Sequence, residues 1–412
     1  MRKRFKGVQS SIARHAAWMM SGAVFQAATA FLANLVLVRI LLPEDFGRFA
    51  IVMANIGLAQ SIISIPIGTV VLRTPKDELK DKLSLYAAAN VVQNLVGLIA
   101  ASTILYLINK LDIKASLLLV SSLSTNWISM QINLYERNFR YKNLSLLETI
   151  AHSSGHIFAV IGALLGIGSI VLYARELVRQ GSLILGLKYI RGIQPIPLRW
   201  LKLRDWQELF KQVRAFWLDG FLESSFGRLV ILTVGIFSGE TGAGYFFQAQ
   251  RLAILPHQFL QPFSQRMAIN YFSHRNPADG QKSFLIKSLK VIFGFLTLAI
   301  VLMALGIPLL VPMIFGEVWR PVVAIFFSMN GYILSATLFN LLKSYFIAKG
   351  KMHILMLLGR SGQYFGFAFC SLLVFLKLYS NPLIGLGIAL SASYMLATML
   401  LLTRIFLFNK LE

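Results

Sequence analysis

Long runs without a charged residue constrain the fold of this chain more than any other feature of its sequence. A helix rises about 1.5 Å per residue, so about 20 apolar residues cross the hydrocarbon of a bilayer. Six gaps between successive charged residues reach about that length or more, and each predicts a membrane-spanning helix. The gaps lie between Arg48 and Arg73, Lys82 and Lys110, Lys114 and Glu136, Lys290 and Glu317, Arg320 and Lys343, and Lys377 and Arg404.

The composition agrees with lipid as the solvent for most of the chain. Hydrophobic residues make up 56% and charged residues 14% of the 412 positions, against roughly a quarter charged in soluble domains. The single cysteine, Cys370, lies in an apolar run, which excludes an intrachain disulfide and a multi-thiolate metal site. The stretch from Ala16 to Leu42 is longer than a signal-peptide core and predicts a retained first helix.

Apolar segments that carry an isolated charge extend the prediction to twelve helices, so the expected fold class is all-α, a polytopic membrane protein. Only Gly166-Ile167-Gly168-Ser169 separates the fifth helix from the sixth, and the sixth carries Arg175, Glu176, Arg179 and Lys188. Part of the sixth is therefore expected to line a cavity or lie at the interface. The twelve segments are 16–41, 48–72, 84–108, 115–135, 144–165, 168–190, 215–237, 243–265, 288–315, 321–348, 353–377 and 382–407.

The distribution of Lys and Arg predicts the orientation of these helices. Most of the 40 basic residues fall on one side if the N-terminus is cytoplasmic, and basic loops favour the cytoplasm. Both termini are then cytoplasmic, as an even number of helices requires. The net charge of +23 is explained by these loops and by anionic lipid headgroups, so no nucleic-acid partner is expected.

The longest internal loop divides the predicted helices into two sets of six. We expect an N-terminal lobe over 1–190, a cytoplasmic linker over 191–214 and a C-terminal lobe over 215–412. Within the linker, 199–214 places Trp206, Leu209, Phe210 and Val213 on one helical face, which is typical of an amphipathic helix on the inner leaflet. The alternative is a plain cytoplasmic loop packed on the helices.

The two halves show a short internal similarity. Phe46-Gly47-Arg48-Phe49 aligns with Ala243-Gly244-Tyr245-Phe246 at an offset of 197 residues. The two segments follow the first and seventh predicted helices. A repeat of six helices would be parallel, with its axis along the membrane normal.

The loops argue against an enzyme. Every loop assigned to the outer side is short, whereas enzymes acting on lipid-linked sugars are expected to keep catalytic residues in sizeable surface loops. The chain also lacks a Gly-rich phosphate loop followed by lysine, so no nucleotide hydrolysis is expected. We therefore assign no catalytic residue and no cofactor.

Arginines inside the predicted helices are the main candidates for a binding site. Arg228, Arg251 and Arg360 lie well within spans, where a charge costs about 2.5–3.5 kcal/mol and usually faces a protein interior or a watery cavity. A guanidinium can grip a pyrophosphate bidentately and keeps its charge. Arg14, at the cytoplasmic mouth of the first helix, is a further candidate. The alternatives are neutralisation by an interhelical carboxylate and, for Arg14, an ordinary topology-setting charge.

Acidic residues are fewer and suggest ion coupling. Asp219 and Glu223 are four positions apart on one helix, so they share a face and must find cations, hold a proton or bind sodium. A structural network with Arg228 or Arg214 is the alternative. Glu148, His152 and His156 also repeat every four residues. Cavity lining explains that stripe better than a metal site, and no metal is assigned.

Two motifs resemble a known family. Leu42-Pro43-Glu44-Asp45-Phe46-Gly47 is similar to the Leu-Gly-Pro-Glu-Asp-Phe-Gly turn of bacterial polysaccharide and O-antigen flippases, although Leu41 precedes it in place of a Leu-Gly pair. These flippases belong to the multidrug, oligosaccharidyl-lipid and polysaccharide (MOP) exporter superfamily. The segment from Gly244 to Leu252, followed by Pro256, resembles their Gly-Tyr-Tyr-x-x-Ala-x-Arg-Leu sequence, with Gln250 as a departure before Arg251.

This resemblance implies two six-helix lobes in a V around a hydrated cationic cavity, as in MATE transporters. It implies a flippase in the bacterial cytoplasmic membrane that carries an undecaprenyl-pyrophosphate-linked oligosaccharide by alternating access. The product would serve O-antigen, capsule or exopolysaccharide synthesis. The implied partners are the lipid-linked substrate, membrane lipid, a coupling H⁺ or Na⁺, and the polysaccharide polymerase machinery.

Three other functions remain open at the level of sequence. A multidrug exporter of the same superfamily is expected to prefer an acidic pocket, so the excess of intramembrane arginine argues against it. A membrane enzyme acting on lipid-linked sugars would change bonds in its substrate. A scaffold for polysaccharide assembly would leave the intramembrane charges with little purpose.

Overall fold

The computed structural model describes residues 21–22, 24–137, 141–261, 264, 268, 272 and 278–407, and every regular element among them is a helix. Contacts group the chain into two units. Unit 1 contains Met1–Leu42 and Ile51–Leu229, and unit 2 contains Pro43–Ala50 and Val230–Glu412. The predicted lobes and linker, divided at 191 and 214, stay a prediction.

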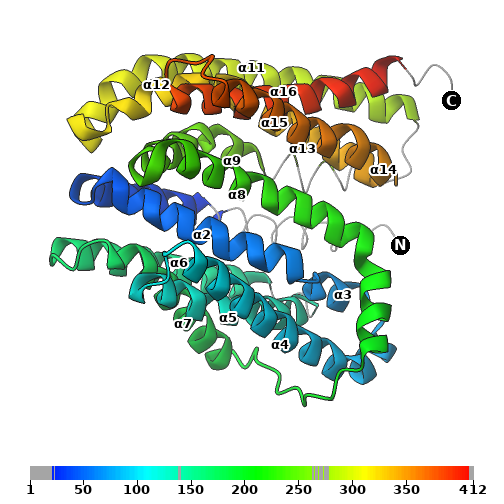
Figure 1. Cartoon of the computed structure of the whole chain (residues 1–412). Coiled ribbons are helices and arrows are strands. Elements are labelled where there is room, and N and C mark those ends of the chain that lie inside the picture. The colour runs from blue at the N-terminus through cyan, green and yellow to red at the C-terminus, as the bar shows by residue number, and fades with distance from the viewer. Residues whose placement is uncertain are drawn as a thin grey trace. The chain divides into compact units, whose positions relative to one another are not determined.

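The helices of unit 1 follow the predicted spans closely (Figure 1). The turn between the fifth and sixth spans is made by Gly166 and Gly168, with φ of 77° and 75°, a backbone conformation that glycine adopts without strain. The helices are Val24–Ile40, α2 (Pro43–Ile63, whose first residues belong to unit 2), α3 (Ile67–Arg73), α4 (Lys76–Leu107), α5 (Ile113–Glu136), α6 (Tyr141–Leu164), α7 (Ile170–Tyr189) and the first part of α8 (Leu203–Ala253).

Unit 2 is built around α13. Leu341, Leu342 and Phe346 are buried there with residues of α11 and α16. Besides the second part of α8, the unit contains α9 (Leu255–Gln261), α11 (Ala278–Leu310), the π-helix η2 (Val311–Phe315), the 3₁₀ turn η3 (Glu317–Trp319), α12 (Pro321–Ser328), α13 (Asn330–Ala348), α14 (Met352–Ile354), the π-helix η4 (Leu355–Arg360), α15 (Ser361–Phe375) and α16 (Pro382–Leu407).

These helices make the chain a multi-pass membrane protein, as the sequence predicts. Among the described residues, six helices are long and apolar enough to cross a bilayer, and Glu317–Ser328 with Asn330–Ala348, bent by 54°, forms a seventh candidate. All twelve predicted segments overlap described helices. Several are interrupted: Pro66 separates α2 from α3, and the buried Gln93 side chain accepts the Ile65 N–H at 2.8 Å at that break.

The amphipathic segment of the linker forms the first turns of α8, which continue into the next span without a loop. Leu209 and Val213 are buried against Val71 of α3 and Tyr86 of α4. Figure 1 shows these turns crossing the ends of helices of unit 1. The apolar face of the segment therefore packs partly on protein.

Asp205 stabilises the start of α8. Its carboxylate accepts the Lys202 N–H at 3.1 Å and pairs with Arg199 at 3.1 Å, which satisfies one of the orphan donors of a helix N-terminus. These donors, the Lys202 N–H first, lower the pKa of the Asp205 carboxyl below its ordinary value.

The internal similarity corresponds to a close crossing of two helices in unit 2. A Cβ on Gly47 of α2 would lie 1.7 Å from the Glu240 carbonyl oxygen, and one on Gly244 of α8 would lie 1.8 Å from the Pro43 carbonyl oxygen. Pro43 and Glu240, like Gly47 and Gly244, are 197 positions apart in the sequence. The contact is therefore reciprocal, as it is across a two-fold axis.

The helices on either side of this contact begin at equivalent places. α2 starts at Pro43, and α8 is broken by Gly239, at φ 65° and ψ −169°, so that a new helical stretch follows it. Trp319 covers the crossing, because the Phe46 ring lies 5.5 Å and the Tyr245 ring 5.9 Å from it, both edge-on. The two motif regions of the sequence thus meet at this crossing.

Replacing either glycine at the crossing should destabilise the protein strongly. Gly47→Val or Gly244→Val forces two backbones apart, and such overpacking costs about 3 kcal/mol or more. Thermal unfolding of the purified protein measures the effect. Gly294→Ala is the matched control, because Gly294 of α11 has nothing within 4 Å of an added Cβ. Equal melting temperatures for all three variants would contradict the close crossing.

Candidate functional site

Unit 1 contains a ladder of amide side chains between its spans. Asn126 of α5 donates to Asn94 of α4 at 2.5 Å, and Asn94 donates to Asn90 at 2.8 Å. Asn90 and Asn94 are buried, and hydrogen bonds of this kind hold helices together where lipid supplies no polar partner. The ladder fixes α4 against α5.

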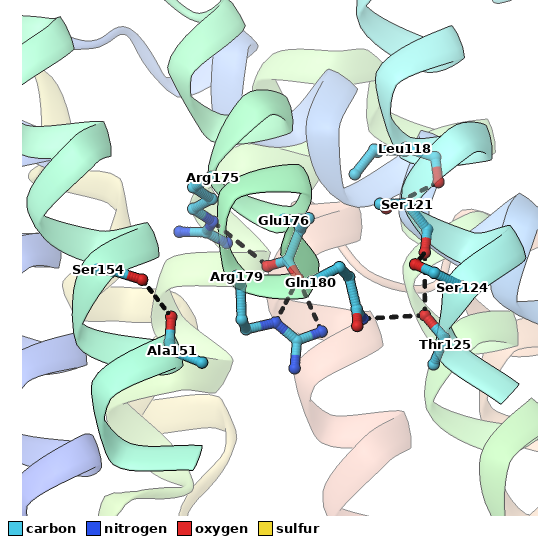
Figure 2. A network of polar contacts seen from close by, with 10 residues as sticks. All are labelled: Leu118, Ser121, Ser124, Thr125, Ala151, Ser154, Arg175, Glu176, Arg179 and Gln180. Carbon is cyan, nitrogen blue, oxygen red and sulfur yellow. Dashed lines mark hydrogen bonds and ion pairs between the residues drawn. The ribbon is translucent and has the colours of Figure 1, made fainter. Parts of the chain in front are cut away.

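A charged cluster lies on α7 (Figure 2). Glu176 pairs with Arg179 at 2.9 Å and lies 3.6 Å from Arg175, and the three side chains are 12–27% exposed. The next residue, Gln180, donates to Thr125 of α5 at 3.0 Å. Two guanidiniums therefore share the Glu176 carboxylate inside a span.

The close approach of α6 and α7 brings further polar groups to the cluster. A Cβ on Gly155 of α6 would lie 2.8 Å from the Arg175 carbonyl oxygen, so the glycine allows the helices to touch. Ser154 contacts Ser182 of α7 at 2.9 Å, and His152 interacts electrostatically with Arg179 and Glu176. His152 belonged to the stripe predicted from the sequence, and it faces arginines and a glutamate.

Arg228 lies near the middle of the α8 span and packs on α2. A Cβ on Gly57 would lie 2.2 Å from Arg228 Nε, so this guanidinium occupies the space that the missing side chain leaves. Arg228 donates to the Ser224 carbonyl at 3.1 Å, and Ser61 and Ser225 meet one turn away at 3.3 Å. A seam of small residues thus holds the arginine between two spans.

Among the residues that the structure describes, Arg228 forms no ion pair with a carboxylate. The alternative of a structural network with Asp219 or Glu223 therefore finds no support at this arginine. Asp219 is buried, at 8% exposure, whereas Glu223 is exposed and Glu148 half-buried. All three acids belong to unit 1, as does Arg228.

The other two candidate arginines belong to unit 2. Arg251 is half-buried, with its guanidinium carbon 5.7 Å from the centroid of the Phe247 ring. Arg360 is 3% exposed, donates to Gln363 at 3.1 Å and lies 5.5 Å from the Phe339 ring centroid. It ends the π-helix η4, a distortion frequent at functional sites. Arg14 lies outside the described residues.

The sequence analysis assigned no role to His257, which makes polar contacts inside unit 2. His257 of α9 is buried, with Nδ1 3.0 Å from the Thr337 hydroxyl and Nε2 3.3 Å from the Asn340 amide nitrogen. The signal in the sequence was a single histidine one residue after Pro256, too little to predict a site. Within the described ranges, no group of three or more His, Cys, Asp or Glu residues could hold a metal ion.

Removing the shared carboxylate of the α7 cluster should destabilise unit 1. Glu176→Gln leaves two guanidiniums facing each other at low exposure, and breaking such a partly buried pair costs about 3 kcal/mol. Thermal unfolding should show a clear loss, and the double variant Glu176→Gln/Arg179→Gln should recover part of it.

The matched control for this series is Glu78→Gln. Glu78 pairs with Lys82 at 2.6 Å, but both side chains are about half exposed, at 54% and 43%. Exposed pairs contribute about 0–1 kcal/mol. Equal unfolding temperatures for Glu176→Gln and Glu78→Gln would show that the α7 cluster does not stabilise the protein.

Comparison with known proteins gives one family match. Residues 36–324 match the family described as polysaccharide biosynthesis protein. Among curated proteins, none matches this chain at the required significance.

The chain resembles solved structures of membrane transporters. An inward-facing multidrug resistance MATE family transporter of the MOP superfamily superposes with a TM-score of 0.69 at 14% identity, over 96% of this chain and 99% of that one. A Vibrio cholerae MATE transporter gives 0.59 at 11% identity, over 99% and 98%. A MOP superfamily transporter from Pyrococcus furiosus, described as having a binding pocket of reverse polarity, gives 0.59 at 16%, over 98% and 96%. These likenesses confirm the predicted transporter fold.

Proposed function

Because this chain belongs to the polysaccharide biosynthesis protein family, we propose that it flips an undecaprenyl-pyrophosphate-linked oligosaccharide across the bacterial cytoplasmic membrane. The family and the fold together indicate a membrane exporter or flippase. The glycan would enter O-antigen, capsule or exopolysaccharide. The polyprenyl tail stays in the bilayer, because removing it from hydrocarbon forfeits about 0.8 kcal/mol per CH₂.

The observation that carries the proposal is Arg228, a half-buried arginine at mid-span with no carboxylate partner among the described residues. Inserting such a charge costs about 2.5–3.5 kcal/mol, so an anion that binds beside it regains part of that cost. A pyrophosphate suits it, because a guanidinium fork matches two phosphate oxygens. Gly57 keeps the site open by leaving room for the side chain.

The arginines of α7 support the same substrate class. Arg175 and Arg179 both contact Glu176, and serine and threonine hydroxyls lie close by, as Figure 2 shows for Ser154 and Thr125. Hydroxyl, amide and guanidinium groups are those that bind sugar hydroxyls and phosphate oxygens. A multidrug exporter for organic cations gains nothing from guanidinium groups inside its spans.

In this proposal the candidate residues that bind the anionic headgroup during alternating access are Arg228, Arg251, Arg360 and Arg14. The superfamily fold is that of transporters solved in inward-facing and outward-facing states. No bond of the substrate changes, so the chain is a transporter rather than an enzyme. Contact with the polymerase machinery stays a prediction.

Removing the Arg228 guanidinium should abolish most transport. In proteoliposomes with a fluorescent lipid-linked oligosaccharide, Arg228→Ala should lower the flipping rate about 30-fold or more, since charge-assisted contacts contribute about 1.5–3 kcal/mol. Gly57→Leu should act similarly, because its side chain displaces a guanidinium that stays in the protein. Arg228→Lys should retain an intermediate rate.

The matched control is Arg204→Ala, at an exposed arginine of the same helix that pairs with Glu208. It should transport at the parent rate. Thermal unfolding checks that each variant is folded, and mass spectrometry of the recovered lipid checks that no bond has changed. Parent-like transport by folded Arg228→Ala and Gly57→Leu would reject the site.

Ion coupling is assigned to the acids of unit 1, with Asp219 as the first candidate because it is buried. A proton gradient should accelerate flipping by the parent, and Asp219→Asn should transport at a rate that no longer responds to the gradient. Glu148→Gln and Glu223→Gln test the other two acids, and the exposed Glu208→Gln is the control. An unchanged response in Asp219→Asn would remove that residue from the coupling.

A further inference from the structure

Unit 1 contains a cavity of about 640 Å³ beneath the start of α8. Three segments form it: the end of α2 with the α2–α3 break, the middle of α4, and the linker with the first turns of α8. Its lining residues on α2 and at the break are Ile62, Ile63 and Ile65; on α4 Val92, Gln93 and Val96; and on the linker and α8 Leu201, Lys202, Leu203, Trp206, Phe210 and Trp217.

The walls of this cavity are apolar and open to solvent or lipid. Ile62, Val92 and Val96 are 51%, 41% and 46% exposed. On the α8 side, the rings of Phe210 and Trp217 meet edge-on at 5.4 Å. An apolar concavity bordered by tryptophans is an environment that suits a lipid chain.

The charge at the cavity is that of a single lysine. The segment 199–214 has five basic and two acidic residues. Both acids are already paired, Asp205 with Arg199 and Glu208 with Arg204, each at 3.1 Å. Lys202, which lines the cavity, forms no ion pair in the described part of the chain. Of the three basic residues left over, Lys202, Lys211 and Arg214, only Lys202 lines the cavity, so its ammonium group is the one that an anion there would meet.

We propose that this cavity binds one anionic glycerophospholipid of the inner leaflet, with an acyl chain against α4 and α8 and its phosphate at Lys202. The charge of the headgroup decides between this occupant and the transported lipid. One lysine balances the single negative charge of a phosphodiester, whereas a pyrophosphate favours the bidentate fork of arginine. The inference depends on the membrane setting of unit 1 and not on the identity of the glycan.

Quenching of tryptophan fluorescence tests this site, because Trp206 and Trp217 line it. Phosphatidylglycerol brominated in its acyl chains is titrated into nanodiscs of unlabelled phosphatidylcholine that hold the full chain. We expect a saturable quenching component that brominated phosphatidylcholine does not produce. Trp206→Phe should remove part of it. Lys202→Ala should weaken the apparent affinity about fivefold, since one lysine near an anionic lipid contributes about 1 kcal/mol.

Two pairs of variants separate this cavity from general lipid contact. Val92→Phe fills the cavity and should abolish the saturable component, whereas Leu95→Phe, at a residue of α4 that is 49% exposed and outside the lining, should not. Lys211→Ala removes an exposed lysine of α8 that does not line the cavity. This variant should leave the affinity for phosphatidylglycerol unchanged.

Three results would overturn the proposal. The first is equal quenching by the two brominated lipids. The second is an equal effect of Lys202→Ala and Lys211→Ala. The third is displacement of brominated phosphatidylglycerol by a stoichiometric amount of polyprenyl phosphate, which would assign the cavity to the tail of the transported lipid.

Discussion

The cost of holding a guanidinium inside a membrane shapes unit 1. Water is absent from the hydrocarbon, so every charged or amide group there needs a protein partner or a bound ligand. Gln180 reaches Thr125, and Glu176 lies between two arginines. Arg228 alone among these cations is packed against a glycine and a backbone carbonyl rather than a carboxylate. Among the described residues of the unit, Arg228 is thus the cation best placed to receive a bound anion.

The positions of the helices could be predicted from the sequence because each charged residue is costly to place in lipid. Long segments without charges therefore mark the spans, whatever their partners in the fold. The last predicted span, 382–407, has the same bounds as α16, and α7 forms despite four charged residues. The continuity of α8 from the linker into a span could not be predicted, since no local signal distinguishes it from a loop. The π-helices at 311–315 and 355–360 likewise depend on packing.

The candidate site could be predicted only in part from the sequence. The arginines stand out in the sequence because they interrupt apolar runs, but their partners come from distant segments. Gly57 and Arg228 are 171 positions apart in the sequence, and nothing near Gly57 indicates that it accommodates a guanidinium. The pairing within 175–179 follows from helical spacing, yet its burial depends on α6 and on Gly155. The fold and family comparisons support transport.

The reciprocal contact of Gly47 and Gly244 has a consequence for the origin of the chain. A surface that contacts its own equivalent is the mark of an isologous dimer, in which one patch serves both subunits. The reciprocal approach of Gly47 and Gly244 is the contact expected if the two halves descend from two copies of one ancestral unit. In such an ancestor, one glycine would have served both subunits at their interface.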